Sequence, residues 1–288
     1  MKREDLQIRD PFILVDNDRY ILLGSTDKNI WNQPGNGFEA YTSRDLEEFT
    51  YAGTLFKRTD SFWGTHDFWA PEMHKYKGAY YIFATFITPG RMRGTAILRS
   101  DNPLGPFTPW GEERATPPEW MCLDGTLHVD DAGDPWIVFC HEWVQIGAGT
   151  ICARRLAPDL SAPIGEPVTL FAATDAAWPR SHTHSSGRIG YITDGPFLTR
   201  SKSGALWMLW SSLTAGGYAI GLAISDGGIL GPWRQTEKPI FAGDGGHGMV
   251  FRDLSGELRL AIHTPNDTPN ERPLFLRIAE DGEGYVIL

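Results

Sequence analysis

The sequence predicts an all-β fold, a five-bladed β-propeller in which each blade is a four-stranded antiparallel sheet. First, five stretches of the 288-residue chain share one layout, in which a short motif leads through a Gly/Asp-rich turn to an apolar strand. Second, the apolar runs are about four to seven residues long, and helical periodicity is almost absent. Third, 32 glycines and 20 prolines lie between those runs rather than in one block. That distribution is typical of many tight turns.

Each of the five stretches begins with Asp, Glu or His beside Gly or Pro. The motifs are Asp10-Pro11-Phe12-Ile13, Ala70-Pro71-Glu72-Met73, Asp124-Gly125-Thr126-Leu127, Asp194-Gly195-Pro196-Phe197 and His247-Gly248-Met249-Val250. Positions 10, 72, 124, 194 and 247 are roughly 50–70 residues apart, slightly long for a four-stranded blade. Five blades around one axis would bring the starts of their innermost strands together, so we expect these five positions to meet at one end of the axis.

Turn signals divide the first two strands of each expected blade, at 16–18, 77–78, 130–134, 203–204 and 255–256. A second repeat marks the third strand and the start of the fourth: residues 98–107 resemble 223–233, and 41–49 form a looser copy. No linker or low-complexity segment is evident. The sequence therefore predicts one domain over 1–288, with blades at approximately 6–56, 64–111, 121–172, 188–237 and 245–288.

Composition narrows the classes of partner. The net charge of −10 disfavours nucleic acid and anionic membranes, and no apolar run is long enough to cross a bilayer. The first six residues lack the apolar core of a signal peptide. The three cysteines make no disulfide framework, and Cys140 and Cys152 are expected to be buried thiols. We expect a cytoplasmic protein or, alternatively, a secreted or periplasmic one that lacks its leader here.

The motifs also resemble a known family. Arg9–Ile13, Phe68–Glu72, Leu123–Gly125, Asp194–Pro196 and Gly246–Gly248 fall in the same order as the blade motifs of glycoside hydrolase family 43. The whole chain thus resembles the five-bladed arabinofuranosidases, xylosidases, arabinanases and galactan or galactofuranoside hydrolases of that family. In one place it departs from them: the fourth-blade motif usually reads Glu-Gly-Pro, with Glu as proton donor, whereas Asp194 is shorter by one methylene.

The resemblance implies hydrolysis with inversion at the anomeric carbon. Inversion requires two carboxyl groups roughly 6.5–9.5 Å apart, one to take a proton from water and one to protonate the glycosidic oxygen. We assign Asp10 as the general base and Asp194 as the general acid. Asp124 is the third carboxylate, which raises the pKa of the acid by like-charge repulsion and orients it. Glu72 and Glu142 are rival acids.

Two neighbours of these carboxylates carry expectations of their own. Arg9 should point away from the axis if Asp10 points toward it, because neighbouring residues of a strand face opposite sides. The resemblance places His247 near the axis, beside a central water or a metal ion, often calcium. Calcium prefers oxygen ligands, and such an ion would be structural or electrostatic rather than hydrolytic. No cofactor is expected to be required, and the sequence contains no ligand cluster of a hydrolytic metal.

Side chains near the motifs are candidates for substrate binding. Aromatic rings can stack on sugars, and polar groups can bond to sugar hydroxyls. The candidates are Trp31, Phe38, His66, Trp69, Glu72, Glu142, Trp143 and Arg272, with His182 and His184 in a Ser/His-rich segment as weaker ones. Trp136, Trp207 and Trp210 lie within apolar runs and are expected in the core.

The predicted function is that of an exo-acting glycoside hydrolase on a carbohydrate partner. Terminal α-L-arabinofuranose is the first choice, followed by β-D-galactofuranose and β-D-xylose. A sugar-binding propeller without catalysis stays open because of Asp194. A five-bladed phosphorylase would need a cluster of Arg, Lys or His that the motifs lack. A retaining fructan-type hydrolase would need Asn-Asp-Pro-Asn-like and Glu-Cys motifs, which are absent, and the blade lengths do not match WD or kelch scaffolds.

Overall fold

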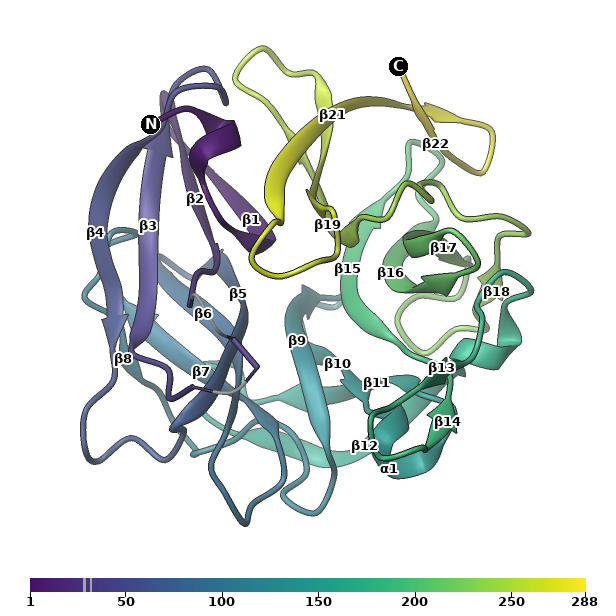
Figure 1. The fold of residues 1–288 in the computed structure, drawn as a ribbon, viewed down its shortest axis with the longest axis horizontal. Coiled ribbons are helices and arrows are strands. Elements are labelled where there is room, and N and C mark those ends of the chain that lie inside the picture. Colours follow the sequence, from purple (N-terminus) through teal and green to yellow (C-terminus); the bar gives the residue numbers. More distant parts are fainter. Residues whose placement is uncertain (28–29, 32) are drawn as a thin grey trace.

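The structure is a computed structural model that describes residues 1–288 except 28, 29 and 32. Its described part contains five four-stranded antiparallel sheets, and the strands of each sheet follow one another in chain order. Figure 1 shows the innermost strands β1, β5, β9, β15 and β19 facing a common centre. The predicted five-bladed propeller is confirmed.

Each blade is one continuous segment of the chain. Blade 1 contains β1 (Arg9–Asp16), β2 (Arg19–Ser25), β3 (Gly37–Ser43) and β4 (Thr50–Lys57). Blade 2 contains β5 (His66–Tyr76), β6 (Ala79–Ile87), β7 (Gly94–Ser100) and β8 (Thr108–Pro109). Blade 3 contains β9 (Cys122–Val129), β10 (Pro135–His141), β11 (Thr150–Leu156) and β12 (Pro163–Ala172).

The remaining two blades complete the ring. Blade 4 contains β15 (Asp194–Arg200), β16 (Leu206–Thr214), β17 (Gly217–Ser225) and β18 (Arg234–Gln235). Blade 5 contains β19 (Gly246–Arg252), β20 (Leu258–Thr264), β21 (Arg272–Asp281) and β22 (Gly284–Ile287). The short elements outside the blades are η1 (Arg3–Asp5), α1 (Trp143–Ile146), η2 (Ala173–Asp175) and the hairpin of β13 (His182–Thr183) with β14 (Ile189–Gly190). None of the helices in the described part of the chain has the length and apolar character needed to span a membrane.

Side chains that pack between neighbouring blades form the core. Between blades 1 and 2 five phenylalanines form one cluster, in which Phe68 and Phe86 meet edge to face with ring centroids 4.8 Å apart. Phe38 belongs to this cluster and is fully buried. The predicted role of Phe38 in substrate binding is therefore wrong, because the Gly/Asn-rich loop ends at Asn36 and β3 carries Phe38 into the core. Trp136, Trp207 and Trp210 are buried, as predicted, and so are the three free cysteines.

Every innermost strand has a β-bulge near its start. The pairing register shifts there in all five blades. The bulge residues have φ between +45° and +55°, and they are Asp10, Ala70, Asp124, Gly195 and His247. Such φ values are uncommon for residues other than glycine, and they cluster at functional sites. Two of the five equivalent positions thus differ from those expected. In blade 2 the bulge residue is Ala70 rather than Glu72, and in blade 4 it is Gly195 rather than Asp194.

The bulges are linked from blade to blade by side chains. Directly opposite the residue before each bulge, the second strand carries Ser25, Thr85, Cys140, Ser211 or His263. In four of these five places the side chain accepts the N–H of the next blade's bulge residue, at 2.8–3.2 Å: Ser25 from Ala70, Thr85 from Asp124, Ser211 from His247 and His263 from Asp10. At the Cys140 position, the N–H of Gly195 donates instead to Asp124 Oδ2.

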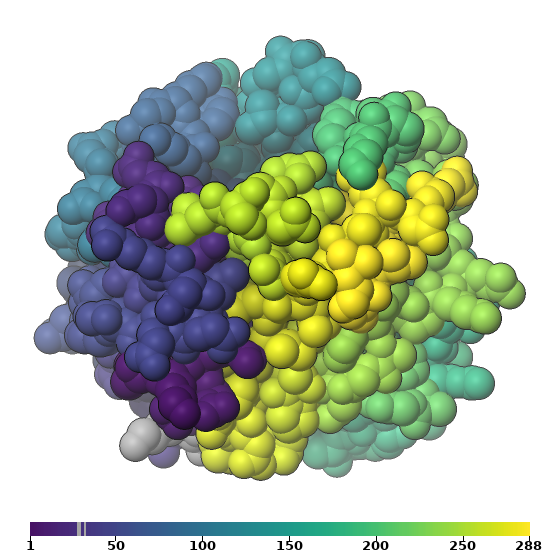
Figure 2. Space-filling view, turned by 90° about the horizontal axis from the view of Figure 1, so that it is seen from above, coloured from purple at the N-terminus to yellow at the C-terminus, as the bar shows by residue number. Residues whose placement is uncertain are grey.

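Side-chain contacts close the ring between blade 5 and blade 1, which lie against each other in Figure 2 (yellow and purple). The N–H of Ile13 lies 3.0 Å from Met249 Sδ, and the N–H of Leu254 donates to the Tyr20 hydroxyl at 2.7 Å. No strand is shared between the first and last sheets in the described part of the chain. The hydrogen bond from the Asp10 N–H to His263 therefore joins blade 1 to blade 5 and also holds Asp10 in place near the axis.

Candidate active site

Three bulge residues bring their side chains together on the propeller axis. The Nδ1 atom of His247 lies 3.3 Å from Asp10 Oδ1 and 3.5 Å from Asp124 Oδ2. The other two bulge residues, Ala70 and Gly195, have almost no side chain, and a Cβ atom at Gly195 would lie only 2.8 Å from the His247 ring. The small residues therefore leave the axis to two carboxylates and one imidazole. We call Asp10, Asp124, Asp194 and His247 the axial cluster.

Asp10 is held from several sides. Its Oδ2 accepts a hydrogen bond from Ser25 Oγ at 2.9 Å, and Arg9 Nε lies 3.8 Å from its Oδ1. The expectation that Arg9 points away from the axis is wrong, because the bulge interrupts the alternation of the strand and turns both neighbours toward the same site. Burial alone would raise the pKa of Asp10, but His247, Arg9 and the Ser25 bond together hold its pKa below the usual range.

Asp194 lies one residue before its bulge and is partly exposed. Its Oδ2 accepts a hydrogen bond from the Tyr218 hydroxyl at 2.9 Å. Burial raises the pKa of Asp194 to about 6, although Tyr218, His247 and Arg9 act in the opposite direction. A carboxylic acid with a raised pKa keeps its proton at mildly acidic pH, as a general acid must.

Asp124 is the third carboxyl of the axial cluster. Burial, together with the charges of Asp194 and Asp10, raises the pKa of Asp124 to about 7 against the opposing effect of His247. The carboxyls of Asp124 and Asp194 therefore titrate as an interacting pair, in which ionisation of one hinders ionisation of the other. The neighbouring aspartates raise the pKa of His247 above the usual histidine value, despite its burial. An imidazolium between the aspartates offsets part of their mutual repulsion.

Glu72 and Glu142 each have hydrogen-bond or ion-pair partners outside the axial cluster. Glu72 lies two residues beyond the bulge residue of β5, is buried, and accepts hydrogen bonds from Thr126 and His74. Its expected position beside Asp10 at the strand start is wrong, because the bulge residue of β5 is Ala70. Glu142 is buried and forms an ion pair with Arg93.

Arg93 was not singled out from the sequence, yet it connects blades 2 and 3 beside the axial cluster. It forms ion pairs with Asp67 and Glu142, and its guanidinium lies 4.4 Å from the centre of the Trp69 ring. The two acids raise the pKa of Arg93 against the effect of burial, so it stays charged. The sequence gives no signal for Arg93, because its partners Asp67 and Glu142 are 26 and 49 residues away along the chain.

Trp31 and Trp69 form an aromatic edge next to Arg9. Trp31 is 50% exposed and meets Trp69 edge to face, with ring centroids 5.1 Å apart. The guanidinium of Arg9 lies over the Trp31 ring, 5.1 Å from its centroid. Trp69 is anchored by a hydrogen bond from Nε1 to the carbonyl of Ile30 at 2.8 Å. An exposed indole beside the axial cluster is suited to stack on a sugar ring.

The other predicted binding residues contact neighbouring side chains. His66 starts β5 and contacts Thr65 through Nδ1 at 2.9 Å. Trp143 is buried, and His182 and His184 meet its ring edge-on at 5.4 and 5.9 Å.

The predicted binding residue Arg272 contacts backbone carbonyls. It donates hydrogen bonds to the backbone carbonyls of Glu4, Pro269 and Glu271, at 2.8–3.1 Å. Its role is to hold the N-terminal segment against blade 5, because these carbonyls occupy its Nε and Nη1 donors.

The resemblance implies a central water or metal ion beside His247. Nδ1 of His247 faces the oxygens of Asp10 and Asp124, whereas its buried Nε2 has no hydrogen-bond partner among the residues that the structure describes. The described residues contain no group of three or more His, Cys, Asp or Glu side chains arranged to hold a metal ion. We therefore derive no step through a metal.

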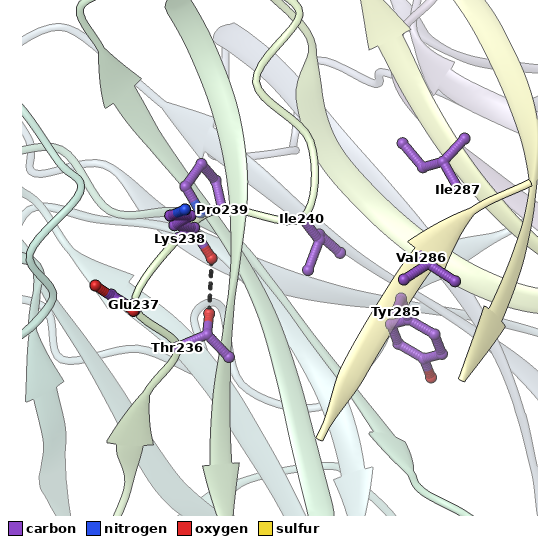
Figure 3. Close-up of a pocket in the computed structure, with 8 residues that line it drawn as sticks. All are labelled: Thr236, Glu237, Lys238, Pro239, Ile240, Tyr285, Val286 and Ile287. Carbon is purple, nitrogen blue, oxygen red and sulfur yellow. Dashed lines mark hydrogen bonds between the residues drawn. The ribbon is translucent and has the colours of Figure 1, made fainter. Parts of the chain in front are cut away.

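A separate open groove lies at the outer edge of blades 4 and 5, between the segment after β18 and strand β22 (Figure 3). Its lining includes Ile240, Tyr285, Val286 and Ile287, and a hydrogen bond from Thr236 Oγ1 to the carbonyl of Lys238 shapes one wall. The groove contains none of the residues of the axial cluster.

The chain is similar to known proteins over nearly its whole length. Residues 5–279 match the family model described as glycosyl hydrolases family 43. The chain is similar to the crystal structure of an endo-arabinase from Bacteroides thetaiotaomicron VPI-5482, at 44% identity and a TM-score of 0.91, with 98% of this chain and 97% of that one covered.

Two curated enzymes are more distant. The extracellular exo-α-(1→5)-L-arabinofuranosidase ArbA of Cellvibrio japonicus is 23% identical over 56% of this chain and 46% of its own. The α-L-arabinofuranosidase 43 of Humicola insolens is 28% identical over 62% of this chain and 37% of its own. The match thus spans less than half the length of either relative.

Proposed function

The chain belongs to glycosyl hydrolase family 43 and is a glycoside hydrolase, and on that premise we propose that it is an inverting, exo-acting α-L-arabinofuranosidase. The observation that carries the proposal is the division of roles within the axial cluster. The surroundings lower the pKa of Asp10 and raise the pKa of Asp194 to about 6, so one carboxyl is ionised while the other holds a proton.

In this mechanism Asp10 takes a proton from a water molecule, whose oxygen attacks the anomeric carbon. At the same time Asp194 gives its proton to the glycosidic oxygen, and the bond to the leaving group breaks. Burial keeps the pKa of Asp194 high, the charge of Asp124 opposes ionisation of Asp194 further, and His247 holds Asp10 and Asp124 in place. The exposed face of Trp31 receives the sugar, with Arg9 behind it.

The choice of sugar rests on the relatives. An endo-arabinase is 44% identical to this chain, and the two curated relatives named above are arabinofuranosidases. L-Arabinofuranose is therefore a better candidate than β-D-galactofuranose or β-D-xylose, which stay as alternatives to be tested on the corresponding 4-nitrophenyl glycosides.

Contacts between loops support exo action. The loop before β3 is tied to blade 5 by the bond from Trp31 Nε1 to Thr268 Oγ1, at 3.3 Å. It is tied to the segment before β5 by the bond from the Gly35 N–H to the Thr65 carbonyl, at 2.9 Å. These contacts anchor Trp31 and Gly35 on both sides, and anchored residues beside the axial cluster suit binding of a chain end. Endo action is the second candidate, favoured by the similarity to the endo-arabinase.

The test uses linear α-1,5-linked arabino-oligosaccharides labelled at the reducing end. Exo action releases arabinose from the first moments, and proton NMR of the fresh product shows the β-anomer if the reaction inverts. Asp10→Asn should abolish turnover, whereas Asp18→Asn, an exposed aspartate at the turn between β1 and β2, should not. Mixed oligomers as first products would indicate endo action, and lack of turnover on all three glycosides and the oligomers would overturn the proposal.

A further inference from the structure

Tyr218 is the residue in direct contact with the proposed acid. It lies at the start of β17, its side chain is only 2% exposed, and its hydroxyl donates to Asp194 Oδ2 at 2.9 Å. Its ring stacks on His263 with centroids 5.7 Å apart. A Cβ atom at Gly246 would lie 2.3 Å from the ring, so Gly246 is needed for the ring to sit there. The position of the hydroxyl is therefore fixed by packing from blade 5.

The chemistry of this contact is directional. Burial and the charge of Asp194 raise the pKa of Tyr218 well above its ordinary value, so the phenol stays protonated and acts as a donor. A carboxylic acid carries its proton on one oxygen only. Since Oδ2 accepts the Tyr218 bond, the proton is favoured on Oδ1, which has no hydrogen-bond partner among the residues the structure describes.

We propose that Tyr218 is a positioning residue for the general acid, holding Asp194 Oδ2 so that the acid presents its proton on Oδ1 to the glycosidic oxygen. This inference rests on the proposed function. An aspartate reaches less far than the glutamate expected in this motif, so the orientation of its carboxyl matters more. The bond to Tyr218 fixes that orientation, which would otherwise be free to rotate about the Cβ–Cγ bond.

The inference has a consequence for pH dependence. The groups that face Asp194 are Tyr218 from β17, His247 from β19, Arg9 from β1, Asp124 from β9, Cys140 from β10 and Glu142 just after β10. Among them Tyr218 is the strongest influence that lowers the pKa of Asp194, because its bond favours the ionised form. Loss of the hydroxyl should raise the pKa of Asp194, and the basic limb of the kcat/KM profile should move to higher pH. General loosening of the site would not move it in that direction.

The experiment compares Tyr218→Phe with wild type on two substrates. Arabinobiose has a poor leaving group and needs the acid, whereas 4-nitrophenyl α-L-arabinofuranoside needs it little. We expect kcat on arabinobiose to fall about 10- to 100-fold, part of what a positioned general acid contributes, with kcat on the aryl glycoside and both KM values nearly unchanged. Tyr285→Phe removes the hydroxyl of a buried tyrosine in blade 5, away from Asp194, and serves as the control. It should leave kcat and KM on both substrates unchanged.

Equal losses on both substrates, an unchanged basic limb, or full activity on arabinobiose would each overturn the inference. Asp194→Asn is measured in parallel to separate it from the proposed function. If Asp194→Asn loses activity mainly on arabinobiose while Tyr218→Phe behaves as wild type, only the role of Tyr218 fails. If Asp194→Asn shows no dependence on the leaving group, the assignment of the acid fails. Should Tyr218→Phe be unfolded by circular dichroism, Tyr218→Met removes the hydroxyl with a more flexible side chain.

Discussion

The backbone N–H of Asp10 donates a hydrogen bond to Nδ1 of His263 at 3.2 Å, which joins the first blade to the last beside the proposed base. Burial and the charge of Arg9 lower the pKa of His263 to about 3, so the ring is neutral and can accept this bond. A single contact therefore links the closure of the ring to the placement of the catalytic carboxylate.

The first prediction concerns stability. His263→Ala leaves the buried N–H of Asp10 without its acceptor, which should lower the free energy of unfolding at pH 7 by about 1–3 kcal/mol. A histidine with a depressed native pKa stabilises the fold above its unfolded pKa of about 6.5, and that contribution is lost as the pH falls toward the native value. The difference between variant and wild type in urea unfolding should therefore shrink between pH 7 and pH 4. The exposed His184→Ala is the control, and a difference independent of pH would contradict the argument.

The second prediction concerns the pH profile of the wild type. The base must be ionised, so activity should fall only when the pH drops through the lowered pKa of Asp10. The acid must be protonated, so activity should also fall as the pH rises past about 6 to 7, where the Asp194 and Asp124 pair titrates. Measurement of kcat/KM between pH 3 and 9 on arabinobiose checks both limbs. A profile flat up to pH 9 would exclude Asp194 as the acid.

The repeats predicted the fold because every blade has the same pattern of apolar strands and turns, and this pattern is visible in the sequence. They located Asp10, Asp124 and His247, all of which lie at bulges in motifs of one kind. They misplaced Glu72 because the bulge residue of β5 is Ala70, two residues earlier, and the sequence alone does not reveal where a bulge lies. The bulge in β1 likewise turned Arg9 toward the axis. Tyr218 and Arg93 gave no signal, since their contacts with Asp194 and Asp67 exist only after the strands are assembled.

Arg9 provides the third prediction. It is among the groups that lower the pKa of Asp10, and Arg9→Met keeps an unbranched chain in contact with Trp31 while removing the charge. The pKa of Asp10 should rise, and the acidic limb of the kcat/KM profile should move to higher pH. Arg19→Met, which removes a charge from the far end of blade 1, should leave the limb in place. A shift in KM alone would indicate that Arg9 binds substrate without affecting the base.

Trp31 provides the fourth. Its indole is half exposed beside the axial cluster, so Trp31→Ala should raise KM for arabinobiose about 10-fold, as expected for the loss of roughly 1–2 kcal/mol of stacking. The value of kcat should change less than about threefold, since no catalytic carboxyl is touched. Tyr51→Ala, which removes an equally exposed ring from the outer strand of blade 1, is the control. Equal KM values for Trp31→Ala and wild type would remove Trp31 from the binding site.

The last prediction separates Asp124 from Tyr218 by the sign of a shift. Burial and the charges of Asp194 and Asp10 raise the pKa of Asp124, and because coupled carboxyls hinder each other's ionisation, the charge of Asp124 should in turn oppose ionisation of Asp194. Asp124→Asn removes it, so the remaining acid should lose its proton at lower pH, and the basic limb should move down. Tyr218→Phe should move the same limb up. If both variants shift the limb in one direction, Asp124 does not act on the acid by repulsion, and its role is limited to the hydrogen bond that it accepts from the N–H of Gly195 at 2.9 Å.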